Sequence, residues 1–119
     1  MCIRDSGTVA AGVFFKIAAV PFHQWAPDVY EGAPTPISAY VSVASKAASF
    51  ALLLRLFLTV FWPVNLDWVV VMEAVAVLSL TVGTLAALNQ SNIKRLLAYS
   101  SITQVGYILL CLLYTSRCV

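Results

Sequence analysis

The chain has 119 residues, of which 61% are hydrophobic and 10% are charged, and its formal net charge is +2. Soluble domains usually carry about 25% charged residues, and a chain this short buries only part of its apolar surface, so the composition excludes an ordinary water-soluble domain. The small net charge gives no reason to expect a nucleic-acid partner. Because a backbone inside lipid must pair its own polar groups, the apolar stretches predict an all-α, multi-pass bundle of transmembrane helices.

The two ends of the chain are predicted to be foreign to the rest. MCIRDS, residues 1–6, can be encoded by ATG TGT ATA AGA GAC AGN, and the reverse complement of this DNA in a shifted frame encodes CLLYTS, residues 111–116. The shared element resembles the transposon end used to fragment DNA for sequencing. We expect residues 1–6 and 111–119 to be translated sequencing adapter, with residues 7–110 the genuine membrane-domain piece. Two unrelated natural termini are the alternative.

All three cysteines lie within these ends, as Cys2, Cys111 and Cys118. Residues 7–110 therefore predict neither a disulfide nor a cysteine metal site.

The first predicted helix covers residues 7–20 and is too short to cross a bilayer. It carries Lys16, and Pro21 follows five residues later. Proline lacks an N–H group and clashes with the carbonyl four residues earlier, so we expect the helix to break near Ile17. Broken helices at membrane depth mark ion and substrate paths, which makes Lys16 a candidate proton-relay amine. The alternative is a lysine that extends from a helix end to the membrane interface.

The proline-rich connection PFHQWAPDVYEGAPTP, residues 21–36, follows this break. Its His23 is a candidate for passing protons between Lys16 and water, because histidine changes charge near neutral pH. The alternative is a histidine that only packs within the loop. The connection also contains an acidic pair and two aromatic side chains of the kind found at membrane interfaces, namely Asp28, Glu31, Trp25 and Tyr30.

The second predicted helix covers residues 37–62 and is long enough to cross with tilt. Lys46 is its tenth residue, so at 1.5 Å per residue it lies about 14 Å into a hydrocarbon core of about 30 Å. Such a lysine is predicted to relay protons, with hydroxyl groups on its own helix, Ser42, Ser45 and Ser49, as hydrogen-bond partners. The alternative is a structural lysine paired with an acid on a helix outside this chain.

Two further helices are predicted, over residues 68–88 and 96–110. Lys94 and Arg95 stand immediately before the last one. Lys94 is a third candidate relay amine, or else a lysine that only fixes topology. Polar side chains suited to a water-filled path or to ordinary inter-helix hydrogen bonds follow it, namely Tyr99, Ser100, Ser101, Thr103 and Gln104.

The basic pair also predicts the orientation of the chain in the membrane. By the positive-inside rule the connection over residues 89–95 lies on the cytoplasmic side. Alternation then places residues 62–67 outside and residues 21–36 on the cytoplasmic side.

Two stretches carry a resemblance to a known family. FKIAAVPFHQWAPDVYEGAPTPISAYVSVASKAASFALLLRLF and NQSNIKRLLAYSSITQVGY resemble the antiporter-like subunits of proton-translocating NADH-quinone oxidoreductase, respiratory complex I, and subunit N in particular. Subunits L and M, and subunits of multisubunit sodium/proton antiporters, share the PxHxWxPD core. They typically differ in the DVYEGAPTP segment, where this chain is similar to subunit N.

The resemblance implies a fold and a set of functional residues. The family fold has fourteen transmembrane helices with two inverted repeats, and this chain would supply the end of helix seven, helices eight and nine, and the start of helix ten. The resemblance places the lysine of the discontinuous helix at Lys16, the relay lysine of helix eight at Lys46 and the lysine of helix ten at Lys94. It places His23 in the break.

The implied function is proton translocation through buried lysines, coupled to quinone reduction elsewhere in the complex. The chain would then be part of a non-redox subunit of an H⁺-translocating NADH:quinone oxidoreductase, and we expect it to be inactive alone. We expect it to bind no cofactor or metal, with NADH, FMN, iron–sulfur clusters and quinone held by the rest of the parent complex. Expected partners are a neighbouring antiporter-like subunit, small membrane subunits and lipid, in a bacterial inner membrane.

Two other functions stay open at this stage. One is a subunit of a multisubunit cation/proton antiporter, which has no redox partner. The other is a membrane scaffold with vestigial charges.

Overall fold

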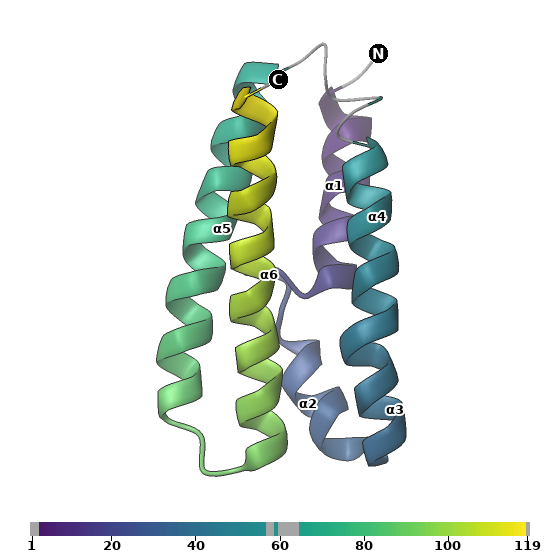
Figure 1. Ribbon diagram of the computed structural model, residues 1–119, viewed down its shortest axis with the longest axis vertical. Helices are drawn as coiled ribbons and strands as arrows, with labels where there is room; N and C mark the ends of the chain where they lie inside the picture. The colour runs from purple at the N-terminus through teal and green to yellow at the C-terminus, as the bar shows by residue number, and fades with distance from the viewer. Residues whose placement is uncertain (1–2, 57–58, 60–64, 119) are drawn as a thin grey trace.

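The computed structural model describes residues 3–56, 59 and 65–118, and within these ranges all the regular elements are helices (Figure 1). The predicted all-α helical bundle is therefore confirmed. In chain order the elements are α1 (Ile3–Ile17), α2 (Trp25–Gly32), α3 (Thr35–Tyr40), the π-helical turn η1 (Val41–Ser45), α4 (Lys46–Leu56), α5 (Asn65–Leu88) and α6 (Ile93–Cys118).

Three stretches are long and apolar enough to cross a membrane: Thr35–Leu56, Trp68–Leu88 and Ile93–Thr115. The first combines α3, η1 and α4. It begins two residues before the predicted start at residue 37, and Pro36 stands in its first turn, where a missing N–H costs nothing. Its predicted end, residues 57, 58 and 60–62, lies outside the described residues.

Helix α1 begins at Ile3 and α6 runs to Cys118. Residues 3–6 and 111–118, which were predicted to be adapter translation, are therefore helical and belong to α1 and α6. Their helical conformation says nothing about their origin, so the adapter translation stays a prediction.

The helices form two antiparallel pairs that stand side by side (Figure 1). Helix α5 descends beside α6, and α1 stands beside α4. Helix α1 ends at about half the height of the molecule, and α2 continues from there to the end that holds the α5–α6 turn. The proline-rich connection and the α5–α6 turn therefore share one end of the molecule, as the alternation of spans predicted.

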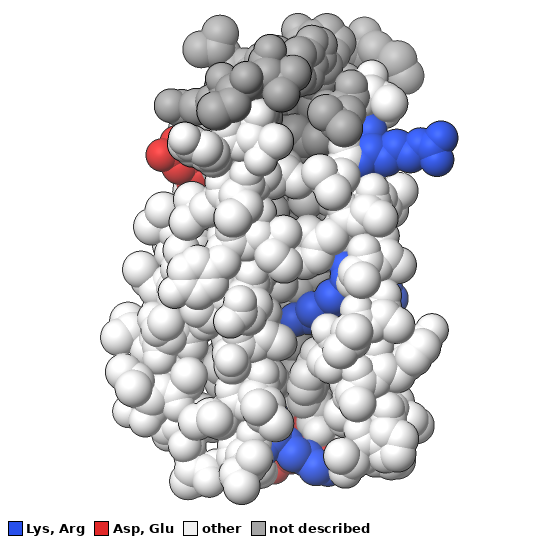
Figure 2. Space-filling model, viewed as in Figure 1, with Lys and Arg blue, Asp and Glu red and all other residues white. Residues whose placement is uncertain are grey.

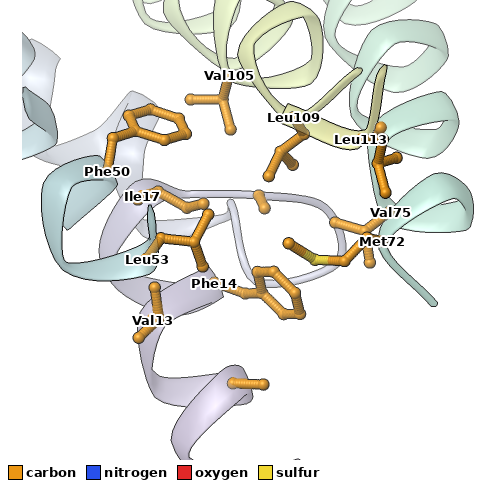
Figure 3. Close-up of a cluster of buried hydrophobic side chains, with 13 residues drawn as sticks. Val13, Phe14, Ile17, Phe50, Leu53, Met72, Val75, Val105, Leu109 and Leu113 are labelled. Atoms are coloured by element: carbon orange, nitrogen blue, oxygen red, sulfur yellow. The ribbon is translucent and has the colours of Figure 1, made fainter. Parts of the chain in front are cut away.

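A hydrophobic core joins the two pairs above the break (Figure 3). Helix α1 contributes residues three and four apart, which lie on one helical face. The core side chains that Figure 3 labels point toward one another from four helices, namely Val13, Phe14, Ile17, Phe50, Leu53, Met72, Val75, Val105, Leu109 and Leu113.

Two glycines allow α5 and α6 to approach closely. A Cβ atom on Gly83 would lie 2.6 Å from Thr103 Oγ1 and 3.2 Å from the Thr103 backbone nitrogen. A Cβ atom on Gly106 would lie 2.8 Å from Leu80 Cγ and 3.1 Å from the Ala76 carbonyl oxygen. Small residues at such crossings are the usual means by which membrane helices pack without a hydrophobic driving force.

Candidate functional site

A cavity of about 610 Å³ lies between α6 and the helical stretch Thr35–Leu56. Figure 2 shows a mostly uncharged face of the molecule, with basic atoms at mid-height and charged side chains of both signs near its lower and upper ends. The wall of the cavity is largely apolar. Its main polar side chains come from α2, α3, α4 and α6, namely Tyr30, Ser38, Lys46, Lys94, Ser101 and Gln104.

Lys46 lies in the middle of its membrane-crossing helix and is buried, with 8% of the residue exposed. It stands eleven residues after Thr35 and ten before Leu56. Its Nζ donates a hydrogen bond to Ser101 Oγ on α6, at 2.8 Å. Among the described residues no ion pair involves Lys46, so the acid-paired alternative finds no partner in this part of the protein.

Two of the expected serine partners on the helix of Lys46 donate to their own backbone. Ser42 donates to the Ala39 carbonyl and Ser49 to the Ser45 carbonyl, each at 2.8 Å. Serine hydroxyls within a helix commonly bond the carbonyl of the preceding turn. The long lysine side chain instead reaches across to α6, so the prediction that Lys46 bonds its own helix is corrected to Ser101.

The π-helical turn η1 ends directly before Lys46. Such turns are rare and occur frequently at functional sites, because one extra residue rotates the side chains that follow. No sequence pattern predicted it.

Lys94 lines the other end of the same cavity. Its Nζ donates to the carbonyl oxygens of Ala33 and Glu31, at 3.2 and 3.5 Å. These carbonyls stand at the C-terminus of α2, where the helix dipole favours a cation. Lys94 thus holds α2 against the start of α6 while it faces the cavity.

A polar cluster reinforces this connection at the same end of the molecule. The Arg95 guanidinium pairs with Asp28 and Glu31, the latter at 2.9 Å from Nε to Oε2. Asn92 Nδ2 donates to Glu31 Oε1, also at 2.9 Å. The acidic pair of the proline-rich connection therefore meets Arg95 in the first turn of α6, a pairing that was not predicted.

The predicted break near Ile17 is confirmed, since α1 ends at that residue. Ala18 follows in the left-handed region with φ 59°. Its N–H donates to the Phe15 carbonyl, and the Ala19 N–H donates to the Phe14 carbonyl, at 3.1 and 2.9 Å. This pair of bonds is a Schellman motif, which ends a helix while it satisfies the last carbonyls.

Side chains satisfy the other backbone groups at the break. The Trp25 indole N–H donates to the Phe15 carbonyl at 2.9 Å. The Val20 N–H donates to Ser79 Oγ at 3.1 Å, and Ser79 donates in turn to the Val75 carbonyl of its own helix. Ser79 is fully buried on α5. Its role was not predicted from the sequence, although a serine within an apolar helix was the signal.

The four predicted relay residues are not gathered in one place within the described part of the chain. Lys46 and Lys94 line one cavity. Lys16 is exposed in the last turn of α1, because the core stripe of that helix passes through Val13 and Ile17. His23 is half-buried between α1 and α2, and its Nδ1 has no hydrogen-bond partner among the described residues. The relay roles of all four stay predictions.

Tyr30 lines the cavity. It is 4% exposed and packs near the break with Val20 and Ile102. Burial raises the pKa of its hydroxyl, and the neighbouring Ser101 hydroxyl lowers it by a smaller amount. The proline-rich pattern did not predict that the Tyr30 side chain would line the cavity.

A buried lysine at mid-span, a helix broken in the membrane region and three apolar spans define the class: a multi-pass helical membrane protein. The chain belongs to the family described as NADH:quinone oxidoreductase/Mrp antiporter, TM, whose family model matches residues 4–118.

Similar curated proteins carry names that agree with the predicted resemblance, which is confirmed. NADH-quinone oxidoreductase subunit N 2 of Solibacter usitatus is 58% identical over 103 residues, which are 87% of this chain and 21% of that protein. NAD(P)H-quinone oxidoreductase subunit 2 of Picosynechococcus is 57% identical over 100 residues, 84% of this chain and 19% of that protein. NADH-quinone oxidoreductase subunit N of Desulforamulus reducens is 56% identical over 101 residues, which are 85% of this chain and 21% of that protein. The chain thus spans about a fifth of the length of these relatives.

Proposed function

We propose that this chain is part of a membrane subunit of NADH-quinone oxidoreductase that translocates protons through buried lysines, with Lys46 as the central relay amine. The observation that carries the proposal is the Lys46 amine, buried at mid-span and hydrogen-bonded to the Ser101 hydroxyl. A carboxylate partner would hold the amine charged. The Ser101 hydroxyl oxygen accepts from the amine, and a neutral amine keeps two N–H groups, so the hydrogen bond can persist in both protonation states.

Lys94, Lys16 and His23 are proposed as further relay positions. Lys94 shares the cavity of Lys46, which gives protons a route toward the end of the molecule that holds the α5–α6 turn. The roles of Lys16 and His23 rest on the resemblance to subunit N and on their place at the helix break.

The names of the relatives support the wider setting. In this setting the subunit performs no redox chemistry itself. NADH oxidation through FMN and iron–sulfur clusters, and quinone reduction, occur in other subunits of the parent complex and drive the proton transfer. The partners are the neighbouring antiporter-like subunit and small membrane subunits, in a bacterial inner membrane.

The test is a pair of substitutions in the full-length parent subunit within its complex. Lys46→Ala removes the amine, and Lys46→Arg keeps a positive charge that cannot be passed on, because guanidinium stays protonated. Positioned acid–base groups contribute about 10²–10⁴-fold to proton-transfer steps, so we expect proton flux per NADH to fall severalfold or more in both variants. Complex content on a native gel should persist.

The control is Arg55→Ala, which removes an exposed charge from the same helix and should leave proton flux unchanged. Full flux in the arginine variant together with lost assembly in the alanine variant would reject the relay role and leave Lys46 as a structural residue. Proton exchange against Na⁺ without NADH oxidation would instead support a cation/proton antiporter, which the family description also includes.

A further inference from the structure

The Tyr30 hydroxyl is a buried polar group whose bonding the fold leaves incomplete. It lines the cavity that contains Lys46 and Ser101. The residue is 4% exposed, and its hydroxyl oxygen has no hydrogen-bond partner among the residues that the structure describes. Buried tyrosine hydroxyls usually find a partner, and an unmet buried donor costs about 1–3 kcal/mol. The Ser101 hydroxyl stands close enough to lower the pKa of Tyr30, but it makes no direct hydrogen bond to the Tyr30 hydroxyl, so a bridging group can complete the bonding of both.

The neighbouring Lys46–Ser101 pair is also incomplete. An ammonium group has three donors, and the hydrogen bonds of the described residues account for the one to Ser101. The Ser101 hydroxyl donates to the Ala98 carbonyl at 2.7 Å and accepts from Lys46, which leaves one lone pair. Three polar groups with unmet capacity thus face one cavity.

The cavity has room for solvent. A buried water occupies about 30 Å³ and makes two to four hydrogen bonds, whereas the cavity measures about 610 Å³. Tyr30, Ser101 and Lys46 supply that number of partners. A water molecule is the smallest group that can both donate and accept among them.

Tyr30 is also held firmly in place. It stands between Asp28 and Glu31 on α2, and both carboxylates pair with Arg95 at the start of α6. Ser38 donates to the Tyr30 carbonyl at 3.2 Å. The part of α2 that carries Tyr30 is therefore tied to α3 and to the start of α6, the elements on either side of the cavity.

We propose that Tyr30 is a positioning residue that holds a water molecule against the Lys46–Ser101 pair. Its consequence for transport rests on the proposed relay function. A proton that leaves Nζ forms an O–H bond to this water, while the water releases one of its own protons to a second water toward Lys94. The O–H bond of Tyr30 stays intact and only orients the first water.

The experiment compares the parent complex with its Tyr30→Phe variant, which removes one oxygen atom and keeps the ring. The matched control is Tyr40→Phe, since Tyr40 lies on α3 and is 68% exposed. A high-resolution density map of the wild-type complex should contain a water within hydrogen-bond distance of the Tyr30 hydroxyl and Ser101. The map of Tyr30→Phe should lack it, and proton flux per NADH should fall severalfold, while the control changes neither.

An empty site in the wild-type map, or a protein side chain in place of the water, would overturn the proposal. So would full proton flux in Tyr30→Phe despite loss of the water. If the water is present but Lys46→Ala pumps fully, the relay function fails and the water site stands. If Tyr30→Phe does not assemble, the wild-type map still decides the presence of the water.

Discussion

Ala18 is the residue at which α1 stops, and it occupies a backbone conformation that glycine usually supplies. Its φ of 59° lies in the left-handed region, which costs a non-glycine residue about 1–2 kcal/mol. The residue is fully buried, so its methyl group contributes about 0.8 kcal/mol of burial in return. The two effects are of similar size, and alanine is therefore tolerated where the motif favours glycine.

We expect Ala18→Gly to leave the parent complex close to wild-type stability, because relief of the backbone offsets the lost methyl group. Ala18→Val should reduce complex content strongly, since a β-branched residue strains a left-handed backbone and also overfills the site. Native gels and thermal unfolding of the assembled complex measure both effects.

Ala19→Val is the control for the cost of overpacking, because Ala19 is as buried as Ala18 but has a negative φ. Overpacking alone costs about 1–3 kcal/mol. Equal losses for the two valine variants would mean that the backbone at Ala18 contributes nothing.

At the scale of the elements, α5 and α6 pack closely at two glycines. Gly83 faces the backbone of Thr103, and Gly106 faces Leu80. A backbone neighbour cannot move aside as the end of a flexible side chain can. Close approach here fixes the position of α6 along its axis relative to α5. It thereby fixes the positions of Ser101 and Lys94 relative to the cavity.

We expect Gly83→Ala in the parent subunit to destabilise the complex by about 1–3 kcal/mol, because the added methyl group forces α5 and α6 apart. Gly12→Ala is the matched control, since a Cβ on Gly12 of α1 meets nothing within 4 Å. The control should be neutral or stabilising by about 0.5–1 kcal/mol, as alanine is the better helix former. Equal thermal stability of the two variants would show that the close α5–α6 contact is not required.

At the scale of the whole molecule, opposite charges define one end. Arg95, Asp28 and Glu31 join α2 to α6 beside the α5–α6 turn. The positive-inside rule assigns this end to the cytoplasm. The opposite end carries the start of α1 and the end of α4 (Figure 1).

Cysteine labelling tests this arrangement in a parent complex from which accessible native cysteines have been removed. Gly32→Cys and Ser91→Cys both introduce thiols at exposed positions of the predicted cytoplasmic end, and Thr59→Cys introduces one beyond α4. An impermeant maleimide should label the first two in inside-out vesicles and the third in right-side-out vesicles. Labelling of Gly32→Cys and Ser91→Cys from opposite sides would contradict the topology.

Several features of the fold and site were predictable because they depend on local chemistry. Apolar length predicted two of the three spans, whereas the third, Ile93–Thr115, extends beyond the predicted helix over residues 96–110. Pro21 predicted the end of α1 at Ile17, and the depth of Lys46 predicted its burial. The partner of Lys46 was not predictable, since Ser101 lies fifty-five positions away in sequence. The serines nearest in sequence were the wrong choice because the packing of α4 against α6 brings Ser101 within reach of the Lys46 amine.

The sequence by itself determined that this protein is a bundle of membrane helices with a break after Lys16 and a lysine at mid-span, because hydrophobic length, proline geometry and charge act within one helix. Only the tertiary structure decided which groups meet across helices. It placed Ser79 against the freed Val20 N–H, Tyr30 in the cavity, and Lys94 on the carbonyls of α2. These contacts depend on how far one helix is rotated and shifted against another, which is set by close packing at sites such as Gly83 and by the π-helical turn before Lys46.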